Sequence, residues 1–165
     1  MFIYILLSMK KSIWGPHIWL FLHLLSMRIK EEYFIEDKKE LIKQINQICS
    51  NLPCPTCSAH ATITLKKLNL SRVNTKEQLT KCIFLLHNEA NKRLKKPEFK
   101  EEELMNHYKV YDFQKAAKNY IRVMNTSNYS ERMLLHSFNK KRFLNEFIDY
   151  IKNNIHKYDI ILNEI

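Results

Sequence analysis

The stretch Leu52-Pro53-Cys54-Pro55-Thr56-Cys57 decides how the middle of the chain folds, because its prolines separate two helices. The residue before a proline avoids helical backbone angles, so the preceding helix must stop at Pro53. Proline is well tolerated in the first turn of a helix, so Pro55 favours a new helix that starts at or near Cys54. The sequence therefore predicts that both cysteines lie at a helix N-terminus, on one face.

A Cys-x-x-Cys pair at this position suits a redox-active dithiol or half of a metal site. The positive end of a helix favours a thiolate, and cysteines at i and i+3 are close enough to form a disulfide. In the redox interpretation, the more exposed Cys54 exchanges with protein thiols and Cys57 faces the core. Electrons then need an acceptor, because two cysteines alone pass them to oxygen too slowly, and this indicates a cofactor such as a flavin.

The zinc interpretation uses the same pair with further ligands from elsewhere in the chain. Structural zinc sites usually combine two close ligand pairs, and the sequence has one Cys-x-x-Cys, so the redox role is favoured and no metal is expected. The candidate additional zinc ligands are Cys49, His60, Cys82 and His87.

The composition favours an all-α protein without a disulfide scaffold. The chain has 165 residues with one Gly and four Pro, which leaves little material for the turns of a large sheet. Its four cysteines are too few to staple a fold of this size. The net charge is +10, but the basic residues are dispersed, so nucleic-acid binding is not expected as the main activity.

The apolar N-terminus, Met1–Leu7, is not expected to anchor the protein in a membrane. A membrane helix needs about 20 apolar residues, and this stretch also lacks the flanks of a secretory signal. Met9 is an alternative start. We therefore expect a soluble intracellular protein without a membrane partner.

Apolar residues at helical spacing predict helices on both sides of the Cys-x-x-Cys motif. Gly15-Pro16 is placed to start the first helix, and Thr75 with Gln78 resembles a capping box. Beyond Tyr108 the pattern changes, so 109–165 is interpreted as a helical extension with Phe138 on its apolar face. The predicted helices are 16–29, 36–52, 54–68, 76–94, a short acidic helix in 98–108, 109–124, and one long or two shorter helices in 131–162, with polar connections at 69–74 and 125–130.

Three blocks stand in a specific order and spacing: Trp14–His23 (WGPHIWLFLH), Leu52–Cys57 (LPCPTC) and His87–Phe99 (HNEANKRLKKPEF). Together they resemble the Erv/ALR family of FAD-linked sulfhydryl oxidases. The segment around the cysteines, with His60-Ala61-Thr62, looks most like the small oxidases of large DNA viruses. The resemblance implies a four-helix bundle around FAD with a short fifth helix in 10–108, and it leaves the role of the extension 109–165 open.

The resemblance also implies which residues meet the cofactor. Trp19 and His23 would lie against the flavin nucleotide from the first helix. His87, Asn88 and Asn91 would hold the adenine and its ribose, and three basic residues would face the pyrophosphate. The full implied set is Gly15, Trp19, His23, His87, Asn88, Asn91, Lys92, Arg93, Lys96, Phe99 and Tyr108.

The implied reaction forms disulfides in protein dithiols, with electrons passing through Cys54 and Cys57 to FAD and then to oxygen, which gives hydrogen peroxide. The implied partners are a dithiol protein substrate or a thioredoxin-like donor and, by analogy, a second copy in a homodimer. If the protein is viral, the host cytoplasm or the virion is its expected location. The alternative is a zinc-stabilised or basic helical interaction protein in which the Cys-x-x-Cys motif is structural.

The sequence departs from the family pattern in its other cysteines. Phe84 stands where many members have the first cysteine of a structural disulfide, and no second Cys-x-x-Cys pair is present. Cys49 and Cys82 are expected to be free, core-packed thiols, although a bond between them stays open. Without an auxiliary pair, Cys54 must meet its substrate or donor directly.

Overall fold

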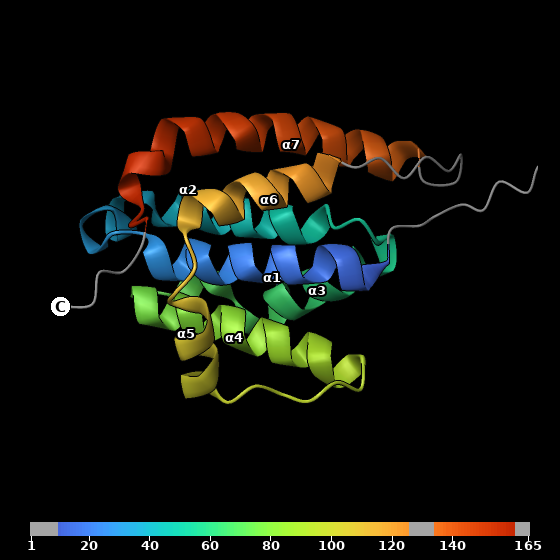
Figure 1. The fold of residues 1–165 in the computed structure, drawn as a ribbon, viewed down its shortest axis with the longest axis horizontal. Coiled ribbons are helices and arrows are strands. Elements are labelled where there is room, and N and C mark those ends of the chain that lie inside the picture. The colour runs from blue at the N-terminus through green and yellow to red at the C-terminus, as the bar shows by residue number, and fades with distance from the viewer. Residues whose placement is uncertain (1–9, 126–133, 161–165) are drawn as a thin grey trace, which may run out of the picture.

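The computed structural model describes residues 10–125 and 134–160, and every regular element in these ranges is helical (Figure 1). The predicted all-α class is therefore confirmed. The apolar start at Met1–Leu7, nearly all of the predicted break at 125–130 and both ends of the last predicted helix lie outside the described residues. The helices are α1 (Lys11–Arg28), α2 (Glu31–Ser50), α3 (Pro55–Leu68), α4 (Lys76–Arg93), α5 (Glu101–Tyr108), α6 (Phe113–Asn125) and α7 (Leu134–Asn154), with short 3-10 turns at Leu70–Arg72 and Ile155–Lys157.

Helix α1 lies in the middle of the molecule (Figure 1). It packs mainly against α6 on one side and α4 on the other, while α2 pairs with α3 and α3 with α4. Ten of its residues are buried, including Phe21, Leu22 and Leu25. A helix that is apolar nearly all round belongs inside a bundle, which is where the sequence pattern predicted it.

The prediction that Gly15-Pro16 starts the first helix is wrong. The helix begins at Lys11, and Pro16 lies inside it. Proline lacks the N–H that would bond the Ser12 carbonyl, but Ser12 is exposed, so water can satisfy that oxygen and the helix continues. Pro16 thus occupies the second turn rather than the first.

Helix α2 begins five residues earlier than predicted and ends at Ser50. Glu31 and Glu32 place negative charge in its first turn, where the helix dipole favours it, and Phe34 is fully buried. Helix α3 begins at Pro55 with Cys54 as its N-cap, as predicted.

Before α4, the predicted cap at Thr75 is confirmed, whereas the predicted polar connection is incomplete. Residues 69–74 form more than a polar connection, because Leu70 and Val73 are buried. The predicted cap at Thr75 is present, since its hydroxyl accepts a bond from the Gln78 backbone at 3.2 Å. The Gln78 side chain returns to the backbone N–H of Asn74 rather than to that of Thr75.

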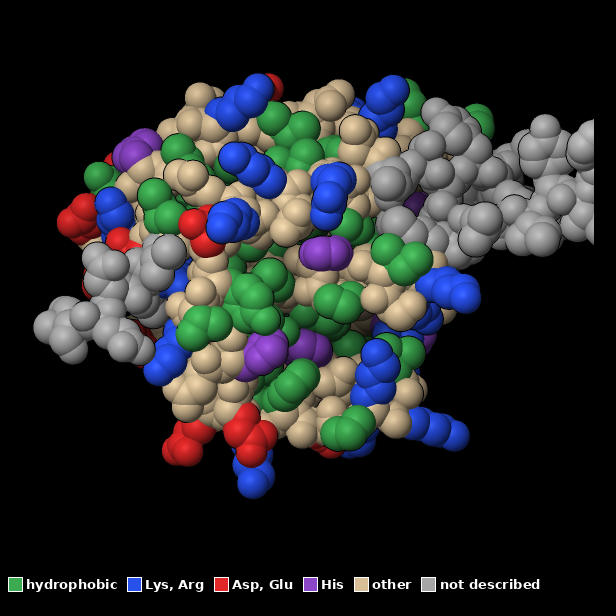
Figure 2. All heavy atoms as spheres, viewed as in Figure 1, with side chains coloured by type: hydrophobic (Ala, Val, Ile, Leu, Met, Phe, Trp, Pro, Cys, Tyr) green, Lys and Arg blue, Asp and Glu red, His purple; other side chains and the backbone are tan. Residues whose placement is uncertain are grey.

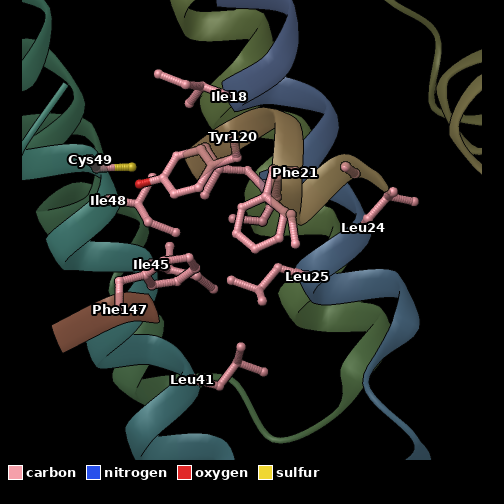
Figure 3. Close-up of a cluster of buried hydrophobic side chains, with 14 of the residues drawn as sticks. Ile18, Phe21, Leu24, Leu25, Leu41, Ile45, Ile48, Cys49, Tyr120 and Phe147 are labelled. Carbon is pink, nitrogen blue, oxygen red and sulfur yellow. The ribbon is translucent and has the colours of Figure 1, made fainter. Parts of the chain in front are cut away.

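Helices α6 and α7 share one continuous core with the rest of the bundle. The Phe21 ring of α1 stacks on Tyr120 of α6 at 4.8 Å and meets the Phe147 ring of α7 edge to face at 5.6 Å (Figure 3). Phe138 was predicted on the apolar face of the extension but is 64% exposed, because it lies opposite the buried side of α7. The extension therefore packs with the bundle, and its separate role stays a prediction.

Arg28 joins the end of α1 to the segment after α5. Its side chain is fully buried, and its Nη2 donates to the backbone carbonyls of Lys109 and Tyr111. A buried guanidinium must donate to acceptors, because an uncompensated buried charge is costly. Arg28 thus fixes the point where the chain leaves the bundle and enters the extension.

The segment 158–160 closes the same corner of the molecule. Asp159 N donates to the Arg28 carbonyl at 2.8 Å, and Ile29 forms an isolated antiparallel bridge with Tyr158. The Tyr158 ring stacks on Phe113 at 4.4 Å. The turn between α1 and α2 is therefore held by residues about 130 positions away in the chain.

The outer surface carries the positive charge in a scattered form. Lysine and arginine side chains are spread over the face seen in Figure 2 rather than gathered in one patch. Within the described ranges, no helix is both long and apolar enough to cross a bilayer.

Candidate functional site

The Cys54–Cys57 pair forms a disulfide at the start of α3, with Cα atoms 5.2 Å apart. Cys54 is the N-cap, and its sulfur accepts a hydrogen bond from the Cys57 backbone N–H at 3.2 Å. Cys54 is half-buried, whereas Cys57 is only 6% exposed. The two cysteines thus differ in exposure as the sequence predicted, with Cys54 the more exposed.

The backbone just before the disulfide is held by two side chains from different parts of the chain. The Leu52 carbonyl accepts a bond from Ser58 Oγ at 3.4 Å and from His136 Nε2 at 2.7 Å. Ser58 belongs to α3, whereas His136 belongs to α7. Sequence reasoning missed His136, and no local signal could reveal a contact across 84 residues of chain.

A cavity of about 710 Å³ opens beside the disulfide, between α1, α3, α4 and the linker that leads to α5. Of the two cysteines, Cys57 is among the described residues that line this cavity and Cys54 is not. A volume of this size is typical of small-molecule and cofactor sites. The predicted cofactor-binding residues that line it are Gly15, Trp19, His87, Asn91, Arg93, Lys96, Phe99 and Tyr108.

Stacked aromatic rings form one wall of this cavity. The Trp19 and His87 rings are 4.0 Å apart and nearly parallel, and Phe99 lies 5.1 Å from His87. Behind them, the His23 ring stacks on Tyr108 at 4.4 Å. The wall is therefore built from α1, α4, the linker and α5, and it offers flat apolar faces to a planar ligand.

His23 and His87 are hydrogen-bonded to each other, with His23 Nε2 3.0 Å from His87 Nδ1. Burial lowers the pKa of His87 to about 4, with Lys96 adding to the effect. Burial lowers the pKa of His23 well below its usual value, and the neighbouring His87 and His107 lower it further. Both rings are neutral near pH 7, so the N–H of one ring donates a hydrogen bond to the unprotonated nitrogen of the other.

Asn88 lies behind the cavity wall and holds the linker. Its side-chain nitrogen donates to the Phe99 carbonyl and its oxygen accepts from the Phe99 N–H, both at 2.9 Å. The Lys96 N–H donates to the Asn91 carbonyl at 2.9 Å, and Lys95 has a positive φ of 55°, so the chain reverses sharply after α4. Asn88 therefore positions Phe99.

The remaining predicted residues differ in how they relate to the cavity. His23 is fully buried behind the aromatic wall, and Lys92 is exposed on α4 without reaching the cavity among the described residues. Gly15 lines the cavity, but a Cβ there would meet nothing within 4 Å, so the protein itself does not require glycine.

Other lining residues were expected only as apolar positions of the first helix, or were not expected at all. Trp14, Ile18 and Leu22 give α1 its apolar side, and their helical spacing with Trp19 predicted a helix that packs in a bundle or against a bound group. The basic Lys11 and Lys67 also reach the cavity. Lys11 precedes the predicted start of the first helix at residue 16. Lys67 has the sequence context of an ordinary exposed lysine, so neither residue was expected at the cavity.

All four cysteines lie in the described ranges, and Cys49 and Cys82 are free thiols there. Cys49 reaches the cavity wall, and burial raises its pKa to about 12. Burial also raises the pKa of Cys82. Neither group is a thiolate near pH 7, so neither is activated for exchange.

The described part of the chain brings no group of three His, Cys, Asp or Glu side chains into metal-binding proximity. His60 lines the cavity from the exposed side of α3. The zinc site that was considered from the sequence therefore receives no support from the geometry.

The fold and the site define a helical-bundle protein with a Cys-x-x-Cys disulfide between solvent and an aromatic cavity. The family model of the Erv1/Alr family matches residues 16–109. The chain belongs to this family, as the three sequence blocks indicated.

Relatives come from large DNA viruses. Proteins named FAD-linked sulfhydryl oxidase from two isolates of African swine fever virus are each 36% identical over 83 residues, which is 50% of this chain and 69% of theirs. A protein of Invertebrate iridescent virus 3, provisionally named an FAD-linked sulfhydryl oxidase, is 28% identical over 113 residues, or 67% of this chain and 76% of its own. No solved structure matches the chain significantly.

Proposed function

We propose that this protein is an FAD-dependent sulfhydryl oxidase that forms disulfides in protein substrates. Membership of the Erv1/Alr family and the names of the viral relatives support this assignment. The structural observation that carries it is the placement of Cys57 in the cavity wall while Cys54 stays outside. One disulfide would thus be accessible to a protein substrate at Cys54 and to a bound cofactor at Cys57.

The residues of the cavity fit FAD. Trp19, His87 and Phe99 offer flat faces for ring systems, and stacking on an aromatic side chain stabilises a base by about 1–3 kcal/mol. Arg93 and Lys96 would face the pyrophosphate, while Lys92 would act from outside the cavity. When bound, FAD would supply the acceptor for the electron pair of Cys57, with oxygen as the final acceptor and hydrogen peroxide as the product.

The chain's own chemistry is thiol–disulfide exchange at Cys54. A substrate thiolate attacks Cys54 Sγ, a mixed disulfide forms, and Cys57 leaves as a thiolate. The second substrate thiol then attacks the substrate sulfur of the mixed disulfide, which releases oxidised substrate and the Cys54 thiolate. The N-terminus of α3 favours both thiolates, because its backbone N–H groups and dipole stabilise negative charge.

The neutral histidine pair fits an apolar ring system. An imidazolium beside the stacking faces would be desolvated at a cost, and both rings stay uncharged near pH 7. Asn88 keeps the Phe99 backbone in place through two bonds. In this proposal, His23 and Asn88 support the cofactor from behind the residues that touch it.

The electron donor is a reduced dithiol protein or a thioredoxin-like protein, and the proposed acceptor is molecular oxygen. A homodimer is proposed by analogy with the family. Light scattering of the full chain tests the dimer, and a mass corresponding to one chain would reject it. Activity in the host cytoplasm or in the virion is proposed from the viral relatives.

The purified full chain is expected to carry flavin absorbance and to consume oxygen with a reduced protein dithiol. Cys57→Ser should keep the flavin and lose turnover, because no thiolate then reaches the cofactor. Cys54→Ser should also lose turnover with a protein substrate. Cys82→Ser is the matched control, because its thiol is distant from the disulfide in sequence and protonated near pH 7.

Two outcomes would contradict the assignment. A chain that takes up no flavin but holds stoichiometric zinc would support the structural interpretation of the Cys-x-x-Cys motif. Full oxygen consumption by Cys57→Ser would remove Cys57 from the electron path.

A further inference from the structure

Helix α7 belongs to the extension beyond the residues that the family model matches, yet it touches the redox site. His136 donates from Nε2 to the Leu52 carbonyl at 2.7 Å, two residues before Cys54. We propose that His136 is a positioning residue that holds the Cys54 loop in the geometry for thiol exchange. This inference rests on the proposed function of the disulfide, and it gives the extension a part in the reaction.

The backbone between α2 and α3 has few other restraints. Asn51 N–H bonds back to the last turn of α2, and the Cys54 carbonyl accepts from Ser58 N–H at 3.0 Å. Between them, Pro53 has no N–H to donate. Besides the packing of the buried Leu52 and Pro53, the loop is held at the Leu52 carbonyl, where two side chains provide hydrogen bonds.

The two donors to this carbonyl differ in strength and origin. The His136 bond at 2.7 Å is short for an N–H···O contact, whereas the Ser58 bond at 3.4 Å is long. Leu52 is buried, so its carbonyl needs a partner from the protein. His136 supplies the better one, and it ties the loop to α7 rather than to α3.

Thiol exchange depends on this loop because the two cysteines stand on different supports. Cys57 lies within the rigid first turn of α3, while Cys54 is the cap between helix and loop. An attacking thiolate must approach Cys54 Sγ in line with the bond to Cys57, and small misplacements of reacting atoms slow such steps. Holding the Leu52–Pro53 peptide keeps Cys54 Sγ in the attackable orientation.

The test compares two variants at one position in the full chain. His136→Leu keeps side-chain volume and removes the donor, whereas His136→Gln keeps an N–H that can reach the carbonyl. Leu135→Ala is the matched control, because Leu135 is the adjacent residue and is 74% exposed. Thermal unfolding followed by circular dichroism shows which variants fold, and His136→Ala replaces His136→Leu if the latter does not.

Two rates are measured. The first is reduction of the Cys54–Cys57 disulfide by reduced glutathione, followed by alkylation of the released thiols, which needs no flavin. The second is anaerobic bleaching of bound flavin by a reduced protein dithiol. His136→Leu should slow both by about fivefold, the factor that corresponds to losing a typical hydrogen bond. His136→Gln should recover most of the loss, while flavin content and reoxidation by oxygen stay unchanged.

Equal rates for His136→Leu and the unmodified chain would overturn the proposal, as would a His136→Gln variant as slow as His136→Leu. A merely structural role predicts lower thermal stability without a selective loss of exchange rate, and that result would also overturn it. If the unmodified chain bleaches no flavin with dithiols, the proposed function fails. The glutathione rates then still decide the role of His136.

Discussion

At the scale of single residues, the buried pair of His23 and His87 makes the stability of the fold depend on pH. The ordinary pKa of a histidine is 6.5, and that of His87 is lowered to about 4. Between these values the unfolded chain binds a proton that the folded site excludes. Stability is therefore full above pH 6.5 and is lost as the pH falls toward 4, by about 3 kcal/mol from His87 alone.

Urea unfolding at several pH values in this window measures the effect. His87→Gln should flatten the dependence, since glutamine does not titrate. His60→Gln is the control, because His60 is exposed and its replacement should leave the slope unchanged. An unchanged slope in His87→Gln would show that His87 does not carry the effect.

Tyr120 carries a hydroxyl that the core does not satisfy. The residue is fully buried, its hydroxyl finds no hydrogen-bond partner among the described residues, and its oxygen points toward Cys49 in Figure 3. Burial raises the pKa of Tyr120 well above its usual value. Tyr120→Phe keeps the stacking on Phe21 and removes the unsatisfied group, so it should stabilise the fold by about 1–2 kcal/mol.

The urea midpoint of Tyr120→Phe is expected to rise. Tyr150→Phe is the comparison, because the Tyr150 hydroxyl is hydrogen-bonded to Tyr158 at 2.7 Å and its loss should lower the midpoint. A destabilised Tyr120→Phe would mean that the hydroxyl has a partner.

At the scale of elements, α4 holds the linker to α5 through Asn88. Asn88→Ala removes both bonds to the Phe99 backbone, so the linker should open more often. The expected loss of stability is about 1–3 kcal/mol for two bonds. Limited trypsin digestion measures the opening directly, because Lys95 and Lys100 lie in or beside the linker and are exposed, whereas Lys96 precedes Pro97 and is not cleaved by trypsin.

Mass spectrometry of the early tryptic fragments should show faster cleavage in 94–100 for Asn88→Ala. Asn46→Ala is the matched control, since Asn46 is exposed on α2 and donates to the Ile42 carbonyl of its own helix. Equal cleavage rates in both variants would show that Asn88 does not hold the linker.

Helices and their caps were largely predictable, because they depend on neighbouring residues. Pro55 and Cys54 stood where the sequence placed them, and so did Thr75. The start of α1 was not predictable from Pro16, because the helix continues through this proline and the freed Ser12 carbonyl can reach water. Local rules treat such a proline as a boundary, whereas solvation decides the outcome.

The candidate site was predictable in its membership more than in its arrangement. The motif blocks predicted Trp19, His87 and Phe99 as cofactor contacts, and all three line the cavity. That Asn88 acts on the linker, and that His136 reaches Leu52, follow from packing between distant elements. Such contacts leave no periodic signal, because they depend on how whole helices are placed.

At the scale of the whole molecule, the core does not end where the family match ends. The match stops at residue 109, whereas the core continues through α6 and α7. A chain cut after Lys109 would expose Phe21, which is fully buried by Phe113, Tyr120 and Phe147 in the full chain. Burial of such a side chain contributes about 1.5–3 kcal/mol, and several are uncovered at once.

The truncated chain is expected to aggregate or to unfold at a lower temperature than the full chain. Size-exclusion chromatography and thermal unfolding measure this, and a chain cut after Asn125, which retains α6, should be intermediate. A soluble, cooperatively folding 1–109 chain would show that the extension is dispensable for the fold.

The corner around Arg28 has a consequence for the order of events during synthesis. Its carbonyl is bonded by Asp159, and the strip from Ile29 to Lys30 is bonded by residues 157 and 158. These partners leave the ribosome more than a hundred residues after α1 has emerged. The apolar sides of α1 therefore stay uncovered until α4 and then α6 have been made. The newly made chain thus depends on slow packing between elements that are distant in sequence.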